Sequence, residues 1–199
     1  MTAEPQHESE NSGQHNNGSR GNPQMYLRFG AMILTSMVIM YAVMYMATWQ
    51  WSHLTWSASR AFMALAMGGT MGFVMLGWML NMYRNRRWNM VIVAVSTLLL
   101  AGGVFLDRSQ ILVGDTAFMS SMIPHHSMAI TRAERFDVTD VRVCELARGI
   151  SDAQRREILE MKWLIEDIAK NGPVRTAAEA EARPVPEFDV SAERQCPTE

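Results

Sequence analysis

The stretch Ala61–Tyr83, AFMALAMGGTMGFVMLGWMLNMY, decides the fold because it is long, apolar and free of charge. A transmembrane helix needs about 20 such residues to cross a hydrocarbon core of roughly 30 Å. Two further apolar segments, Tyr26–Trp49 and Trp88–Leu106, lie on either side of it. We therefore predict an all-α chain with a three-helix transmembrane region at residues 25–106.

The charges around these segments predict their orientation. Between Leu27 and Leu106 every charged residue is an arginine, and three of the five stand in the short connection Arg84–Arg87. Short arginine-rich loops stay on the cytoplasmic side of a membrane. We therefore expect a cytoplasmic N-terminus, with everything after Leu106 outside the cytoplasm. Three tryptophans of the first loop then belong to an outer aromatic belt: Trp49, Trp51 and Trp56.

Methionine is concentrated in the apolar region, where 13 of the 18 methionines lie between Met25 and Met90. The second segment carries five of them at a spacing of four: Met63, Met67, Met71, Met75 and Met79. Each step of four drifts about 40° around a helix, so the ladder winds round it instead of lining one face. Packing by a flexible apolar side chain is therefore favoured over a copper path. Gly68 and Gly72 form a G-x-x-x-G pair that permits close helix packing.

The two ends of the chain have compositions that do not build a core. Residues 1–24 are polar and rich in Asn, Ser and Gly, and residues 173–199 are rich in Ala, Glu and Pro. We predict a disordered N-terminal tail and a flexible C-terminal tail. From Asp107 onward there are 17 acidic and 12 basic residues, and the whole chain carries a net charge of −2. This charge gives no support to nucleic-acid binding through bulk electrostatics.

Residues 107–172 have the pattern of a helical hairpin. The first helix is expected at about 115–135, with a turn at 136–138 and Thr139 as the N-cap of the second helix. Asn171-Gly172-Pro173 is a typical helix stop. A hairpin of about 60 residues cannot bury both of its faces alone. It must therefore pack on the membrane region or complete a bundle by self-association into a homo-oligomer.

The first helix of this hairpin contains the adjacent pair His125–His126 within Asp115–Ile130, DTAFMSSMIPHHSMAI. Imidazole suits several transition metals, and the methionine thioether selects monovalent copper. Spacings of 4, 3 and 4 place four side chains on one helix face: Asp115, Met119, Met122 and His126. His125 points about 100° away from that face, and Pro124 is expected to kink the helix. The alternative is an ordinary core with a buried histidine.

A second set of polar and thioether side chains follows on the later helix. Gln154, Glu157 and Met161 are spaced by 3 and 4, so the two helices can converge on one site. His53, in the first loop on the same side, is either an additional ligand or a solvated histidine. The two cysteines, Cys144 and Cys196, lack the spacing of a zinc or redox motif. They can pair within or between chains outside the cytoplasm, and the alternative is that Cys144 is a small apolar core residue.

The motifs MIPHHSMAI, preceded by D-x-x-F-M, and AxxIxxAQxxEIxxM resemble the family called domain of unknown function 305. That resemblance implies a ferritin-like helical fold outside the cytoplasm and copper binding through Met and His in metal tolerance. The layout is similar to a membrane-anchored bacterial branch, in the plasma membrane with a periplasmic or extracellular C-terminal domain. Five residues match the motif by position: Met119, Met122, His125, His126 and Met161.

Three further positions match the family motif with less certain roles: Asp115, Gln154 and Glu157. Arg132 stands where many members have a methionine, and Met128 is a candidate replacement for that soft ligand. Many members also carry two motif copies, whereas this chain has one, which favours an oligomer.

Two hypotheses about function follow. In the first, the chain is a membrane-anchored metal-binding protein that sequesters copper(I), or silver, or passes it to a copper-handling partner protein. In the second, the hairpin is a non-enzymatic assembly module of a membrane complex, and its histidines are structural. An enzyme is disfavoured, because the hairpin has neither the Glu-x-x-His motif of di-iron bundles nor the His-Glu-x-x-His motif of zinc hydrolases.

Overall fold

The computed structural model describes residues 23–197, so the disorder predicted for residues 1–24 lies almost entirely outside this range. As predicted, the described part is helical and contains no β-strand. The elements are α1 (Pro23–Val43), the single 3-10 turn η1 (Trp51–His53), α2 (Ala58–Trp78), α3 (Arg86–Ser109), α4 (Asp115–Arg135), α5 (Val141–Asn171) and α6 (Ala177–Ala182).

Helices α1, α2 and α3 are long and apolar enough to cross a membrane, with 21, 21 and 24 residues. Their number is as predicted, but their boundaries differ. α1 ends at Val43 instead of near Trp49, and α3, predicted to be the shortest, is the longest. The helix α3 continues beyond the apolar segment, which ends at Leu106, and includes the polar residues Asp107–Ser109. It ends where Gln110 adopts a left-handed backbone at φ 52°.

Glycines let the membrane helices approach each other. A Cβ on Gly69 would lie 2.6 Å from the backbone oxygen of Ser96, and one on Gly103 would lie 2.7 Å from that of Phe62. Both contacts join α2 to α3. The predicted pair Gly68 and Gly72 also packs closely, against a methionine of α1 and a serine of α3 respectively. Close packing through small residues is therefore present, and it involves more positions than the G-x-x-x-G pair.

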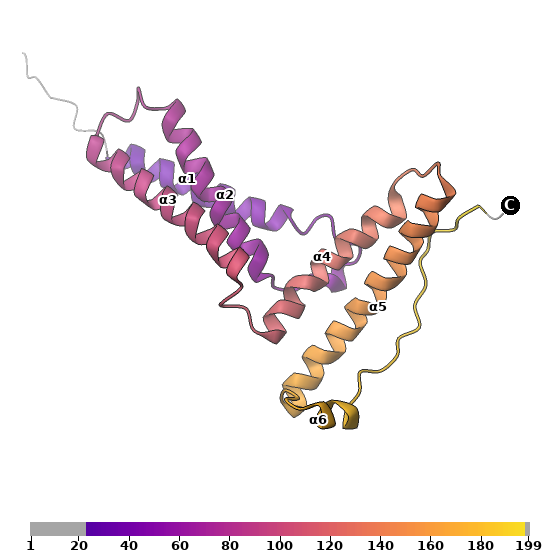
Figure 1. Cartoon of the computed structure of the whole chain (residues 1–199). Coiled ribbons are helices and arrows are strands. Elements are labelled where there is room, and N and C mark those ends of the chain that lie inside the picture. The colour runs from indigo at the N-terminus through magenta and orange to yellow at the C-terminus, as the bar shows by residue number, and fades with distance from the viewer. Residues whose placement is uncertain (1–22, 198–199) are drawn as a thin grey trace, which may run out of the picture.

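The hairpin α4–α5 lies at one end of the three helices, and α4 runs across that end next to the α1–α2 loop (Figure 1). α4 has the predicted bounds and continues through Pro124. α5 begins one residue later than predicted, because its N-cap is Asp140 and not Thr139. The Asp140 carboxylate accepts a hydrogen bond from the backbone N–H of Arg142 at 2.9 Å. Gly172, at φ 77°, follows the last residue of α5, as the predicted stop requires.

The loop at 44–57 is bound to α4 by a row of hydrogen bonds. The backbone N–H of Trp49 donates to Ser127 Oγ at 2.7 Å. The Thr55 hydroxyl donates to the carbonyl of Ser120 at 2.6 Å. In a regular helix that carbonyl would accept from residue 124, but proline has no N–H to offer. Pro124 thus leaves a free acceptor on α4, and the loop occupies it.

The segment after α5 makes specific contacts with the hairpin, which the prediction of a flexible tail for residues 173–199 did not include. Residues 183–197, called here the C-terminal strap, run back along the hairpin (Figure 1). A disulfide joins Cys144 to Cys196. The Arg194 guanidinium donates to the carbonyl oxygens of Ala133 at 2.6 Å and Phe136 at 2.6 Å. The composition of this segment gave no sign of its order, because a covalent link and a few polar contacts hold it.

Candidate functional site

Three of the predicted thioether ligands lie in the apolar layer between α4 and α5. Met119 and Met161 are 7% and 9% exposed, and Met122 packs against the same layer. The remaining buried members of this layer are Ile123, Ile130 and Ile158. The 3 and 4 spacing turns the α4 methionines towards α5, and the antiparallel pairing brings Met161 to them. The structure therefore brings Met119, Met122 and Met161 together.

His126 faces α5 on the same side of α4. Its Nδ1 lies 3.1 Å from Glu157 Oε2, and its side chain is 14% exposed. That distance suits an ion pair, yet the buried Nδ1 lacks the alignment of a hydrogen bond and has no other partner among the described residues. Glu157 also accepts a hydrogen bond from Gln154 Nε2 at 3.3 Å. The arrangement leaves a buried imidazole nitrogen with spare capacity to bind.

Electrostatics favours the neutral form of this imidazole. Burial lowers the pKa of His126 below its ordinary value, and His125 lowers it further, although the Glu157 carboxylate opposes both. A neutral imidazole is the form that binds metals. His126 is therefore ready to bind at neutral pH without first losing a proton.

The other predicted ligands lie apart from this layer. His125 is exposed, and its ring centroid is 6.0 Å from that of His126 with an interplanar angle of 60°. Met128 is partly exposed and is not a member of the apolar layer. Asp115 is an exposed residue at the start of α4. The structure thus separates a buried set from three peripheral residues.

A cavity of about 570 Å³ lies at the elbow between α3 and α4 and connects two of the predicted residues. Asp115 and Met122 both line it, together with a second carboxylate, Asp107. Its remaining lining residues are Ser59, Gln110, Val113, Gly114, Phe118 and Ser121. Two carboxylates at its wall attract cations. The elbow cavity therefore lies between two carboxylates and one methionine that packs against the apolar layer.

The donor set decides which metals fit. Within residues 23–197, no three His, Cys, Asp or Glu side chains are grouped as a metal site. A site built only from imidazole, thiolate and carboxylate is therefore not formed by this part of the chain. The buried donors are thioethers and one imidazole, a set that suits soft monovalent metals.

His53 has a structural place that the sequence did not indicate. It is 7% exposed, and its Nδ1 lies 2.9 Å from Ser127 Oγ. Burial lowers the pKa of His53 to about 4, with further contributions from Lys162 and Arg155. It is therefore neither a solvated histidine nor a member of the methionine layer, but a neutral hydrogen-bonding residue between the loop and α4.

The packing of Trp49 on the hairpin was also not predicted, because the sequence analysis considered this residue only as part of an aromatic belt. It packs against the apolar layer of the hairpin, and the guanidinium groups of Arg135 and Arg155 each lie 5.3 Å from its ring. No local sequence signal distinguishes it from Trp51 and Trp56.

The model of the family described as Domain of unknown function (DUF305) matches residues 115–193. A relative from Acanthamoeba polyphaga mimivirus, named "Uncharacterized protein L153", is 31% identical over 106 residues, which covers 49% of this chain and 68% of the relative. The chain belongs to the DUF305 family. No solved structure matches it.

The DUF305 region contains α4, α5, α6 and most of the C-terminal strap. It leaves out the three apolar helices. The family unit therefore extends beyond the two motif helices and includes the segment that returns along the hairpin.

Proposed function

We propose that this chain is a membrane-anchored metal-binding protein that holds copper(I), and also silver(I), between α4 and α5. The ligands are Met119, Met122, Met161 and His126. The observation that carries this proposal is the buried His126 Nδ1, which has no aligned hydrogen bond and lies beside an interhelical layer of thioethers. Soft ligands in an apolar layer match the preference of monovalent copper.

Two neighbouring groups have supporting roles in this proposal. Glu157, whose Oε2 lies 3.1 Å from His126 Nδ1, would hold the orientation of the imidazole next to a metal bound by His126. His125, exposed one position earlier, is available to a partner protein at the surface. Copper is thus either sequestered in the layer or transferred to a copper-handling partner through this exposed side.

The anchoring part of the proposal rests on the three apolar helices. The three arginines of the α2–α3 connection support a cytoplasmic position for that connection. In this proposal the hairpin lies on the outer, non-cytoplasmic side of a bacterial plasma membrane. A disulfide between Cys144 and Cys196 is compatible with that compartment.

The test uses the full chain in detergent micelles, because α4 is bound to the loop at 44–57 and the strap is bound to α5. Silver(I) is titrated first as a redox-inert probe, followed by copper(I) against a competing chelator and by zinc. We expect tight binding of both monovalent ions. Replacement of Met119 and Met122 by leucine, or of His126 by glutamine, should weaken it at least tenfold. Met128→Leu, outside the layer, is the matched control.

Two outcomes contradict the proposal. One is a folded wild-type chain that binds neither ion. The other is equal weakening by the control and by the layer variants, which would move the binding site elsewhere. A higher affinity for zinc than for silver would also contradict a soft-metal site.

A second candidate function, homo-oligomeric assembly, is favoured by one observation. Val143, Leu146 and Ile150 form an apolar stripe on α5 and are 44%, 64% and 41% exposed. Helices with such a stripe bury it against a partner. The mass of the purified chain, compared with that of Leu146→Glu, tests this proposal, and an unchanged monomeric mass would contradict it.

A further inference from the structure

Large apolar side chains are exposed at the end of the three helices that carries the hairpin. Four belong to the α1–α2 loop: Met46 at 81%, Trp51 at 86%, Leu54 at 41% and Trp56 at 68%. Three belong to the α3–α4 elbow: Ile111 at 65%, Leu112 at 69% and Phe118 at 53%. These seven residues are called here the apolar rim. Apolar patches of this kind mark a contact surface.

The α1–α2 loop and the α3–α4 elbow, which carry the two groups of rim residues, lie at the same end of the three-helix region, next to the hairpin (Figure 1). Thr55, next to Trp56, donates a hydrogen bond to the Ser120 carbonyl of α4. Ser59, at the start of α2, lines the elbow cavity together with Phe118. The loop and the elbow therefore border one continuous end of the membrane region.

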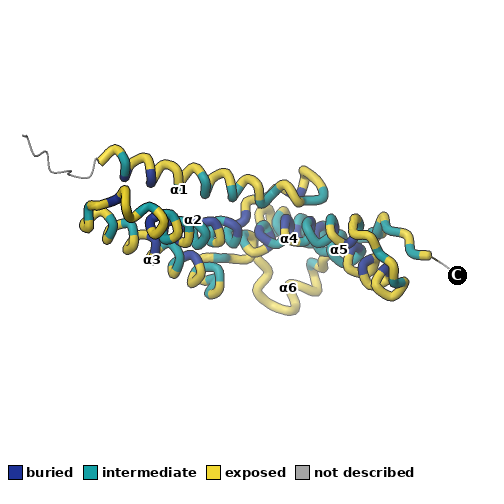
Figure 2. The backbone as a smooth tube through the Cα atoms, turned by 90° about the horizontal axis from the view of Figure 1, so that it is seen from above, coloured by how far each residue is buried: buried dark blue, intermediate teal, exposed yellow. Residues whose placement is uncertain are grey.

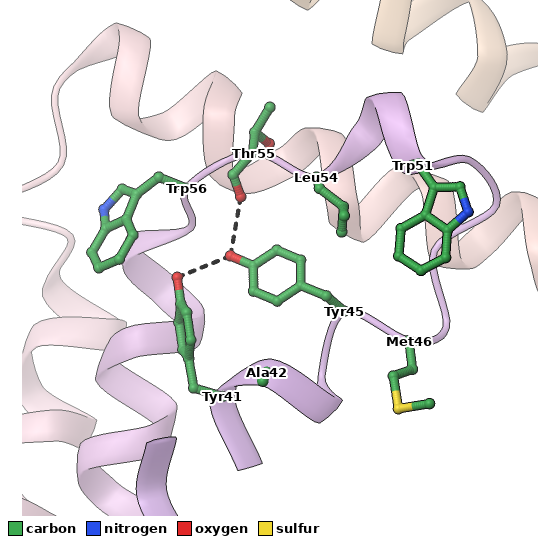
Figure 3. A pocket seen from close by; sticks show the side chains of 8 residues that line it. All are labelled: Tyr41, Ala42, Tyr45, Met46, Trp51, Leu54, Thr55 and Trp56. Atoms are coloured by element: carbon green, nitrogen blue, oxygen red, sulfur yellow. Dashed lines mark hydrogen bonds between the residues drawn. The ribbon is translucent and has the colours of Figure 1, made fainter. Parts of the chain in front are cut away.

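The loop side of the rim encloses a groove of about 470 Å³. Its lining residues are Tyr41, Ala42, Tyr45, Met46, Trp51, Leu54, Thr55 and Trp56 (Figure 3). The Tyr45 hydroxyl donates to the Thr55 carbonyl at 3.0 Å. Since a carbonyl only accepts, the Tyr41 hydroxyl donates in turn to Tyr45, at 3.0 Å. The donors of both tyrosines are thus used internally, and the groove offers mainly rings and aliphatic groups.

We propose that the apolar rim is embedded in the lipid leaflet at the hairpin end, and that the groove takes a lipid acyl chain. The 24 residues of α3 span about 36 Å, which exceeds a hydrocarbon core of roughly 30 Å. Ile111 and Leu112 follow the C-cap residue of α3, Gln110, and would lie at the membrane boundary. Tryptophan is the residue that favours this interfacial depth.

Continuity with the apolar helices identifies lipid as the partner. The rim begins at the ends of helices whose surfaces are themselves apolar and exposed. Arg108, exposed in the last turn of α3, has the length to reach lipid phosphate from this position. The start of α4 then rests on the membrane, and the elbow cavity opens at the lipid–water boundary. This inference rests on the membrane-anchoring part of the proposed function and not on metal binding.

The experiment measures depth by site-directed spin labelling of the full chain in nanodiscs of phosphatidylcholine and phosphatidylglycerol, without added metal. Both native cysteines are in the disulfide, so the unmodified chain should take up no label. Nitroxide is attached in turn to Trp56→Cys, Leu112→Cys and Phe118→Cys. The matched control is Arg142→Cys at the start of α5, where the native side chain is 89% exposed and lies away from the rim.

Oxygen concentrates in lipid, whereas a nickel chelate stays in water. We expect the ratio of oxygen to nickel accessibility to be several-fold higher at the three rim positions than at residue 142. High nickel accessibility at all four positions would overturn the proposal. Low accessibility to both agents at the rim would also overturn it, because it would mean that protein covers these residues.

A second measurement covers labelled variants that fail to fold. Brominated lipids quench tryptophan emission on contact. The Trp51→Phe/Trp56→Phe variant should lose a larger part of the quenching than the control Trp163→Phe, whose residue lies on α5. Equal losses would contradict the embedding. A metal titration of the same nanodiscs is independent of both readouts, so failure of one proposal leaves the other standing.

Discussion

The three-helix region and the DUF305 hairpin of this chain differ in how much of their apolar surface is buried inside the protein. In the apolar windows of α1 and α3 only 11% of the residues are buried inside the protein, and in α2 28% are. α1 is exposed along most of its length (Figure 2). Parts of the hairpin are instead covered by other segments of the chain: the loop at 44–57 contacts α4, and a disulfide joins the strap to α5.

The difference shows what each region requires from its surroundings. The membrane helices need lipid to cover them and use glycine to approach each other. The hairpin has a thin core, so it depends on contacts from distant parts of the chain. Polar groups provide many of these contacts, because the hydrogen bonds that join the loop and the start of α2 to α4 end on a serine hydroxyl or on a backbone carbonyl.

The largest effect should come from the disulfide, because it closes a long loop in the hairpin region. For residues 52 positions apart, loss of the bond costs about 4 kcal/mol in the chain-entropy model. The Cys144→Ala/Cys196→Ala variant should therefore unfold its hairpin at clearly lower urea than the wild type. Reduction of the wild type should reproduce the loss and leave the variant unchanged. A shift below about 1 kcal/mol would mean that polar contacts alone hold the strap.

A smaller effect should come from filling the helix contact in the membrane region. A Cβ on Gly103 meets the backbone of Phe62 and Ala66 at 2.7 and 2.8 Å, whereas one on Gly102 meets nothing within 4 Å. Gly103→Val should destabilise the three-helix region by about 2 kcal/mol, and Gly102→Val should have little effect. Thermal unfolding in detergent compares the two. Equal stability of both variants would mean that α2 and α3 are not in this register.

The features predictable from sequence are those with a local cause. The three apolar helices follow from run length, and the bounds of α4 follow from helical periodicity and the turn after it. The facing of Met119, Met122 and Met161 follows from spacing within an antiparallel pair. Each of these depends on neighbours within a few turns of the chain.

The features that sequence did not predict join distant positions. Trp49 and His53 meet Ser127 across separations of 78 and 74 residues, and nothing in their local pattern indicates it. The order of the strap depends on Arg194 and Cys196, two residues in a segment whose average composition is that of a flexible tail. The average composition of a sequence window cannot reveal a single disulfide or a single arginine that donates to several carbonyl oxygens.

An acid-dependent effect should act on the strap and on the contact between α4 and α5, through Glu134. The Glu134 carboxylate is 3% exposed and bonds to Ser151, to the Glu193 N–H and to Arg155. Burial raises the pKa of Glu134, but these hydrogen bonds outweigh it and lower the pKa below its ordinary value. A lowered folded pKa means stability that is present above the unfolded pKa and lost as pH falls through the folded pKa.

The prediction is therefore that the strap loosens only in acid, below the ordinary range of a glutamate. Glu134→Gln should cost about 2 kcal/mol at neutral pH and remove this pH dependence. Hydrogen exchange of residues 183–197 measures it, with the exposed Glu166→Gln as control. A strap that loosens on raising the pH would reverse the sign and refute the assignment.

The smallest effect, and the sharpest test of how the two regions are joined, concerns Thr55 and Pro124. Thr55→Val removes the donor to the Ser120 carbonyl and should cost about 1 kcal/mol, because a buried acceptor is left unpaired. Pro124→Ala restores the helical N–H that can pair with the same carbonyl. In that background Thr55→Val should cost much less, and the difference is the coupling energy of a double-mutant cycle. Equal costs in both backgrounds would mean that the free carbonyl does not hold the loop. A coupling to Pro124→Ala that is present for Thr55→Val and absent for the isosteric control Thr131→Val would show that the proline in the histidine motif helps to bind the hairpin to the three-helix region.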